Sequence, residues 1–128
     1  MEKYLGIDVG TTSMKGLVVD ENGRLLDTYS WPLKMDIPKP GWAEQDPNLW
    51  WEGVLEILRN VSLKHTISAI GFSGQMHSLV CLDKNFQVIR PAILWCDQRT
   101  TQQCKKATEI MGGETKVIEK MGNPFLEG

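Results

Sequence analysis

Residues 4–20 read YLGIDVGTTSMKGLVVD, and this stretch decides the predicted fold. Its first part, Tyr4–Val9, is a mostly apolar run that stops at Gly10, as expected of a buried strand. Residues 11–13 (Thr-Thr-Ser) form a polar turn, and Met14–Asp20 is rich enough in β-branched residues to form a second strand. The sequence therefore predicts a strand, a tight turn and a returning strand.

The pattern continues on the C-terminal side of this stretch. Asn22–Gly23 is a strong hairpin signal because both residues tolerate positive φ, and Leu25–Ser30 then returns as a third strand of an antiparallel meander. Residues 31–45 carry three prolines and a glycine and are expected to be an extended connector without regular structure. A helix is predicted over residues 46–61, with Asp at the N-cap and Pro at the first helical position.

The second half of the chain predicts further α/β elements. They are a fourth strand (Ile67–Phe72), a polar loop (73–77), a fifth strand (Leu79–Leu82) with a turn (83–85) and a return at Val88–Ile89, an extended segment (91–95), a helix that stops at Gly112–Gly113, and a short helix (Glu114–Met121). Strand–helix–strand steps place helices against a mixed sheet, so the expected fold class is α/β with an actin-like or RNase H-like layout. Residues 1–128 contain no linker and end without a closing element, which predicts an incomplete N-terminal part of a longer domain.

The composition is that of an average globular protein, with 41% hydrophobic and 23% charged residues. A net charge of −2 argues against a nucleic-acid binder that neutralises phosphates. No apolar run approaches the roughly 20 residues that span a bilayer, and no secretory signal is visible. Cys81, Cys96 and Cys104 share no CxxC spacing, and His65 and His77 have no metal-ligand partners nearby. The sequence predicts reduced thiols and a cytoplasmic location, without nucleic acid or membrane as a partner.

The turn after the first predicted strand has the residue types of a phosphate site. A carboxylate at the end of a strand, here Asp8, can hold a hydrated Mg²⁺. Gly10 lets a phosphate approach the backbone, and Thr11 and Thr12 offer hydroxyl and amide donors. A plain β-turn whose Asp bonds its own backbone explains the same five residues equally well, and the hairpin that follows favours the phosphate reading.

Residues 5–15 resemble the first phosphate motif of the superfamily that includes sugar kinases, Hsp70 and actin. Trp42–Pro47 followed by Trp50–Trp51, then Ser73–His77, then Pro91–Thr100 are similar in order and spacing to the FGGY carbohydrate kinases, and most similar to the xylulokinase branch. The resemblance implies transfer of the γ-phosphoryl group of MgATP to a terminal hydroxyl of D-xylulose, giving D-xylulose 5-phosphate. The reaction is expected in a cleft between two actin-like domains.

The resemblance also implies roles for individual residues. It assigns Mg²⁺ to Asp8, the ATP phosphates to Gly10, Thr11, Thr12 and Lys15, and the sugar to Gln75, Met76, His77, Trp95, Asp97 and Arg99. Three of these have equally simple structural explanations: Lys15 as part of a strand, and Asp97 as a helix cap that pairs with Arg99. The catalytic base and the adenosine site of the family lie further along the chain than Gly128, so no catalytic residue is assigned and the isolated chain is predicted to be inactive.

The sequence leaves open another sugar substrate and two other classes of protein. Ser78 stands where xylulokinases usually have Gly, and the string Met-His-Ser-Leu is similar to the gluconate kinases of the same family. A non-enzymatic actin-like or Hsp70-like nucleotide-binding module would share the motif at Asp8 but not the stretches at 75–77 and 95–99. An RNase H-like nuclease would need a cluster of carboxylates that holds two metals. An incomplete sheet also exposes an edge strand, which predicts self-association.

Overall fold

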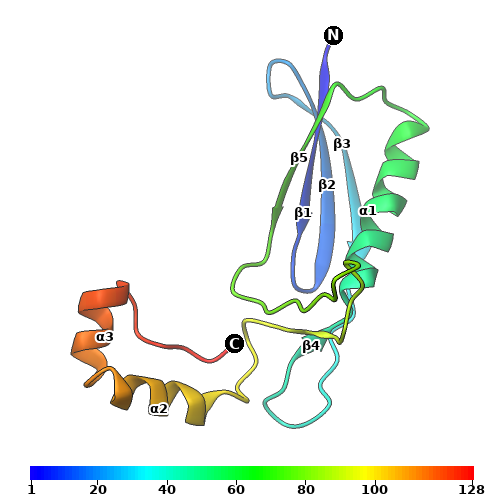
Figure 1. Ribbon diagram of the computed structural model, residues 1–128. Helices are drawn as coiled ribbons and strands as arrows, with labels where there is room; N and C mark the ends of the chain where they lie inside the picture. Colours follow the sequence, from blue (N-terminus) through cyan, green and yellow to red (C-terminus); the bar gives the residue numbers. More distant parts are fainter.

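The centre of the molecule is a four-stranded mixed sheet, seen in the computed structural model of residues 1–128 (Figure 1). The strands are β1 (Lys3–Val9), β2 (Ser13–Asp20), β3 (Leu25–Pro32) and β5 (Ala69–Gly74), in the spatial order β3-β2-β1-β5. The first three strands are antiparallel neighbours, and β5 lies parallel to β1. The predicted meander and the α/β fold class are confirmed.

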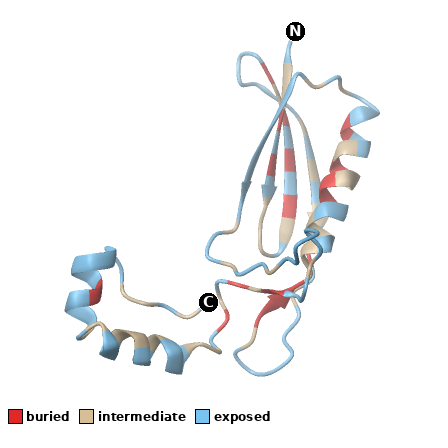
Figure 2. Cartoon of the chain, in the orientation of Figure 1, coloured by how far each residue is buried: buried red, intermediate tan, exposed pale blue.

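One face of the sheet packs against helix α1 (Pro47–Ser62). Leu5 and Ile7 of β1 are buried on this face, whereas Gly6 and Asp8, which alternate with them, are exposed. The expected buried strand is therefore buried on one face only, and Asp8 is exposed. Figure 2 shows buried and exposed residues alternating along the strands of the sheet. The main core consists of Leu5, Ile7, Met14, Val18, Leu33, Val54, Ile57 and Val61.

Two local signals explain the position of α1. The Asp46 side chain accepts a hydrogen bond from the Asn48 amide at 2.9 Å, which caps the first turn as the sequence predicts. Close approach of helix and sheet depends on Gly16, because a Cβ atom there would lie 2.8 Å from the Ile57 side chain. A larger residue would push α1 away from β2.

The turn between β2 and β3 lies where the sequence places it, but only Gly23 adopts positive φ, at 78°. The carboxylate of Asp20 accepts hydrogen bonds from the amides of Asn22 and Arg24, each at 2.9 Å. This side chain satisfies the turn backbone, so Asn22 does not need the left-handed conformation.

The expected structureless connector contains a short strand. Strand β4 (Glu44–Gln45) pairs antiparallel with β6 (Ala92–Ile93), and both strands of this small sheet are largely buried. The expected fifth strand at Leu79–Leu82 is wrong. Leu79 pairs with Ile93 of β6 and Leu82 pairs with Val88, but each pairing is an isolated bridge of one residue, so no continuous strand forms and both leucines remain about half exposed.

Helices α2 (Thr101–Ile110) and α3 (Glu114–Met121) extend away from the sheet (Figure 1). Gly112 and Gly113 end α2 with positive φ, as predicted. The apolar face of α2 is only partly covered, since Cys104 and Ala107 are partly buried but Ile110 is 76% exposed. None of the helices has the length and apolar character to cross a membrane.

Candidate functional site

The site begins at the β1–β2 turn (residues 10–12). The Gly10 amide donates to the Ser13 carbonyl at 3.2 Å, and a Cβ atom on Gly10 would lie 2.6 Å from that same oxygen. Only glycine therefore fits this turn without displacing the backbone. The tight turn places Thr11 beside the end of β1, next to Asp8.

Parallel pairing of β1 with β5 brings a second loop to the same edge of the sheet. Ser73 lies opposite Asp8 in the register, and its hydroxyl donates to Asp8 Oδ1 at 2.7 Å. The β5 loop (residues 75–78) follows directly. Because the carboxyl ends of parallel strands meet at one edge, the β1–β2 turn and the β5 loop become neighbours although they are far apart in sequence.

An open cavity of about 380 Å³ lies between these two loops. It is lined by Asp8, Gly10, Thr11, Gly74, Gln75, Met76, His77 and Trp95. The structure therefore brings seven of the predicted site residues to one cavity, from three separate segments of the chain. The Met76 side chain is 71% exposed at the rim, and the Trp95 side chain is half exposed. The cavity offers apolar surface and polar groups together, which suits a small polyhydroxylated ligand.

His77 has a strained backbone, with φ at 58°. The left-handed conformation costs a non-glycine residue roughly 1–2 kcal/mol. Strain of this kind is concentrated at binding and catalytic sites, where the benefit of a correctly placed side chain outweighs the conformational cost. The imidazole of His77 also borders a second cavity, of about 550 Å³, formed with Trp95 and residues 123–128.

Trp95 joins the two sides of the cavity. Its indole Nε1 donates to Thr11 Oγ1 at 3.0 Å, and its backbone amide donates to the Ser78 hydroxyl at 3.2 Å. The ring is thereby held against the β1–β2 turn while about half of the residue stays exposed. An aromatic ring fixed in this way is a suitable platform for the apolar face of a sugar.

Four predicted site residues do not line this cavity: Thr12, Lys15, Asp97 and Arg99. Thr12 is exposed and its carbonyl accepts from the Leu33 amide at 2.9 Å. Lys15 lies opposite Asp8 in the β1–β2 ladder and borders a neighbouring hollow of about 470 Å³ that Asp8 also borders. Asp8 thus stands between two hollows.

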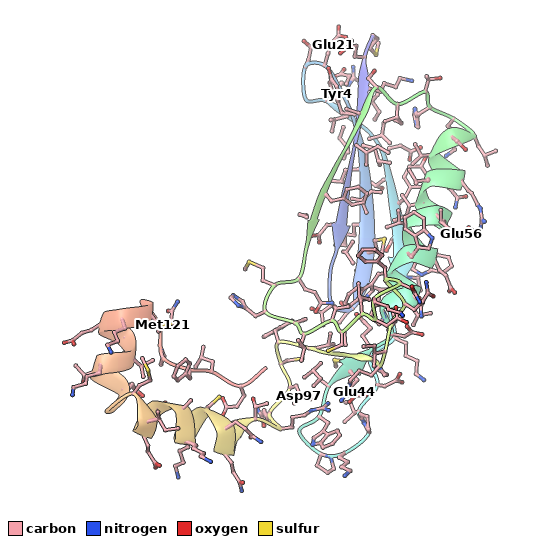
Figure 3. All side chains as sticks on the ribbon, viewed as in Figure 1. Tyr4, Glu21, Glu44, Glu56, Asp97 and Met121 are labelled. Carbon is pink, nitrogen blue, oxygen red and sulfur yellow. The ribbon has the colours of Figure 1, made fainter.

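Asp97 and Glu44, both labelled in Figure 3, form a largely buried ion-pair cluster with Arg99. Arg99 Nη2 lies 2.6 Å from Asp97 Oδ2, and Arg99 Nη1 lies 2.8 Å from Glu44 Oε1. The Arg99 guanidinium also lies 3.8 Å above the centre of the Trp42 ring. Asp97 pairs with Arg99 as the structural alternative anticipated, but it does not cap α2, whose N-cap is Thr100.

The electrostatics of this cluster favour permanent charge on both partners. Burial of the Asp97 carboxyl acts to raise its pKa, but hydrogen bonds from Arg99 and from the Ala43 amide outweigh burial and lower the pKa to about 2. Hydrogen bonding to Asp97 also raises the pKa of Arg99. The cluster therefore fixes the segment that carries Trp95 at any physiological pH.

The residues present fit a metal held by one protein carboxylate. Asp8 Oδ1 accepts from Ser73, and Oδ2 remains on the side of Gly10. The structure contains no group of three or more His, Cys, Asp or Glu side chains that could hold a metal ion. A single carboxylate suits Mg²⁺, which keeps several waters and takes substrate phosphates as further ligands. A nuclease of the two-metal type needs a carboxylate cluster, which this site lacks.

A mixed sheet with flanking helices, and a carboxylate beside a glycine turn at its edge, define the N-terminal part of an actin-like ATPase domain. The chain belongs to the FGGY family of carbohydrate kinases, whose N-terminal domain it matches over residues 3–128. The family resemblance stated from the sequence is therefore confirmed.

Individual relatives agree with this assignment. A xylulose kinase of Lactococcus lactis is 42% identical over 100% of this chain and 26% of its own length. Among solved structures, a ligand-bound xylulose kinase from Lactobacillus acidophilus is 31% identical, with a TM-score of 0.84 over 93% of this chain and 24% of its own. A gluconate kinase from Lactobacillus acidophilus is 32% identical, with a TM-score of 0.84 over 92% of this chain and 24% of its own. The chain spans about a quarter of the length of these relatives.

Two residues of the site had no predicted role. Ser73 orients the Asp8 carboxylate, and Gln45 donates to the carbonyl of Thr11 at 2.9 Å. Both stand within the stretches that carry the family resemblance. A predicted parallel pairing of residues 69–74 with β1 would have placed Ser73 beside Asp8, whereas nothing local in the sequence points to Gln45.

Proposed function

We propose that the protein containing this chain transfers the γ-phosphoryl group of ATP to the terminal hydroxyl of D-xylulose, giving D-xylulose 5-phosphate and ADP. The observation that carries the proposal is one cavity that contains both the Asp8 carboxylate and the β5 loop with His77. The xylulose kinases among the relatives are 35–42% identical to this chain. They support xylulose as the sugar.

Three side chains would hold the sugar. The His77 imidazole offers one donor and one acceptor to neighbouring hydroxyl groups. Met76 supplies a polarizable contact for carbon faces, and Trp95 supplies a stacking surface. Asp97 and Arg99 act on the sugar indirectly, by fixing the segment of Trp95 through their ion pair.

The β1–β2 turn would face the phosphates. Gly10 leaves room for a phosphate oxygen, and Thr11 and Thr12 present backbone amides in the turn. Lys15 adds a positive charge in the neighbouring hollow beside Asp8. Asp8 is the residue that would hold Mg²⁺, which neutralises charge on the transferred phosphoryl group when bound. The attacking hydroxyl must lose its proton to a base, and no residue of this chain is assigned that role.

Gluconate is the second candidate substrate. Ser78 follows His77, and the structure of the gluconate kinase matches this chain as well as that of the xylulose kinase from the same organism. A non-enzymatic nucleotide-binding module is the less favoured alternative, because the cavity carries the β5 loop and Trp95 in addition to the phosphate turn.

The experiment compares the full-length protein with the isolated chain of 128 residues. Each is incubated with MgATP and either D-xylulose or D-gluconate, and sugar phosphate is followed by ³¹P NMR. We expect D-xylulose 5-phosphate from the full-length protein only. Phosphorylation of gluconate alone would identify the second candidate, and turnover by the isolated chain would contradict the assignment of the base and adenosine contacts to residues outside it.

The same preparation tests self-association of the isolated chain. Strand β5 is a sheet edge whose six residues are all exposed, including Phe72 at 64%. Exposed edges and apolar side chains promote pairing with a second copy. Light scattering should therefore show a mass that rises with concentration, and a constant monomer mass would contradict this.

A further inference from the structure

Gln45 is a fully buried side chain at the end of β4 that is not among the residues lining the cavity. Its amide uses all four hydrogen-bonding positions. Nε2 donates to the carbonyls of Thr11 at 2.9 Å and Lys34 at 3.2 Å. Oε1 accepts from Trp50 Nε1 at 2.7 Å and from Gln75 Nε2 at 3.2 Å. Gln45 therefore contacts both the β1–β2 turn and the β5 loop from outside the cavity.

The amide of Gln75 is occupied in the same way. Its Nε2 donates to Gln45 and, at 3.4 Å, to the Gly10 carbonyl. Its Oε1 accepts from Thr11 Oγ1 at 3.3 Å and from the Ser78 hydroxyl at 3.5 Å. A primary amide has two donor hydrogens and two acceptor lone pairs, so Gln75 has none left for a ligand. Its side chain joins the β1–β2 turn to the β5 loop.

We infer that Gln45 is a positioning residue for phosphoryl transfer: through Gln75 it fixes the distance between the phosphate-binding turn and the sugar-binding loop. The inference rests on the proposed function. It extends that function to a residue that lines no part of the ligand cavity, and it makes Gln75 a link between the loops rather than a sugar ligand.

Two physical arguments indicate that Gln45 affects the relative position of the reacting groups and not the affinity for either ligand. Hydrogen bonds of a buried, fully satisfied amide are strengthened by the low local dielectric, so the link between the loops is stiff. Phosphoryl transfer requires the attacking oxygen and the phosphorus in line and close. A misplacement of about 1 Å can lower the rate by roughly a hundredfold. Each loop alone would still bind its own ligand.

The experiment replaces Gln45 by Met in the full-length protein, which keeps the side-chain length and removes every hydrogen bond. We expect kcat for D-xylulose to fall by roughly tenfold to a hundredfold, while KM for sugar and for ATP each change less than about threefold. Gln75→Met cuts the same link from the loop side and should give the same division between kcat and KM. It provides the test if the buried substitution prevents folding.

Trp50→Phe is the matched control. It removes the hydrogen bond from α1 to Gln45 Oε1 and leaves both bonds to the loops. We expect kcat of Trp50→Phe to stay within about threefold of wild type. Its loss of thermal stability should be comparable to that of Gln45→Met. Equal losses of kcat in Trp50→Phe and Gln45→Met would show a general structural effect and overturn the inference.

Two further outcomes separate the inference from the proposed function. If Gln75→Met raises KM for the sugar and leaves kcat intact, Gln75 is a sugar ligand and the inference fails while the kinase assignment stands. If Gln45→Met keeps a wild-type kcat in an enzyme that phosphorylates D-xylulose, the inference alone fails. If the wild-type protein phosphorylates no sugar, the proposed function fails first.

Discussion

Asp8→Ala in the full-length protein is expected to lower kcat/KM for sugar phosphorylation by roughly a hundredfold to a thousandfold. The carboxylate stands between the two hollows of the site, and it is the group placed to hold Mg²⁺. Without this carboxylate Mg²⁺ loses its protein ligand, and the charge on the phosphoryl group loses its electrostatic stabilisation during transfer. Steady-state kinetics with varied sugar, repeated over a range of Mg²⁺ concentrations, measure the effect.

Two companion variants separate the effect of the Asp8 charge from the effect of the orientation of its carboxylate. Ser73→Ala removes the hydrogen bond to Asp8 Oδ1 and keeps the carboxylate, so a loss of about tenfold is expected from a misoriented ligand. Asp8→Asn keeps the shape and removes the charge, and should raise the Mg²⁺ concentration needed for half-maximal rate. An Asp8→Ala enzyme within about tenfold of wild type would show that this carboxylate does not serve the metal.

His77→Gly should separate binding from folding. Loss of two neutral hydrogen bonds to the sugar, each worth about 1 kcal/mol, predicts a fall in kcat/KM for D-xylulose of roughly thirtyfold. Glycine also relieves the strain at φ 58°, and this gain offsets the greater backbone entropy that glycine loses on folding. The free energy of unfolding should therefore change by less than about 1 kcal/mol.

The only other histidine of this chain supplies the control. His65 lies at the opposite end of the sheet, where its ring contacts Lys3 and Asp27. His65→Gln should leave the kinetic constants for sugar and ATP unchanged. A His77→Gly enzyme with wild-type kcat/KM for the sugar would remove His77 from the binding site.

Local signals in the sequence were sufficient for most of the fold. The apolar run Tyr4–Val9, the β-branched stretch in Met14–Asp20, the turn at Gly23 and the cap at Asp46 are each determined by neighbouring residues, and all lie where expected. The segment Leu79–Leu82 has the residue types of a strand. It makes only one-residue bridges, to Ile93 and to Val88, and the extent of pairing depends on these partners and not on the segment itself.

The remaining features of the fold and of the site depend on pairing between residues that are far apart in the sequence. The two-residue strands β4 and β6 lie almost 50 residues apart, and although residues 91–95 are expected to be extended, nothing local indicates that they pair with β4. Asp97 and Arg99 stand two residues apart, a spacing that fits a sugar contact and an ion pair equally well, and only Glu44 and Ala43 from the connector complete the cluster. The shared cavity itself depends on the parallel pairing of β5 with β1.

Kinase activity at this site requires Asp8 and His77 to face one ligand-filled cavity, and paramagnetic NMR tests this directly. The full-length protein, labelled at histidine, is titrated with Mn²⁺ and ATP, and the His77 signal is assigned by its loss in His77→Gly. His65 serves as the internal reference, because it contacts Lys3, roughly 17 Å along β1 from Asp8. We expect strong broadening of the His77 imidazole signal and a weak effect on His65. Equal effects on the two histidines, or a sharp His77 signal with the metal bound, would place the metal elsewhere and contradict the kinase assignment of this site.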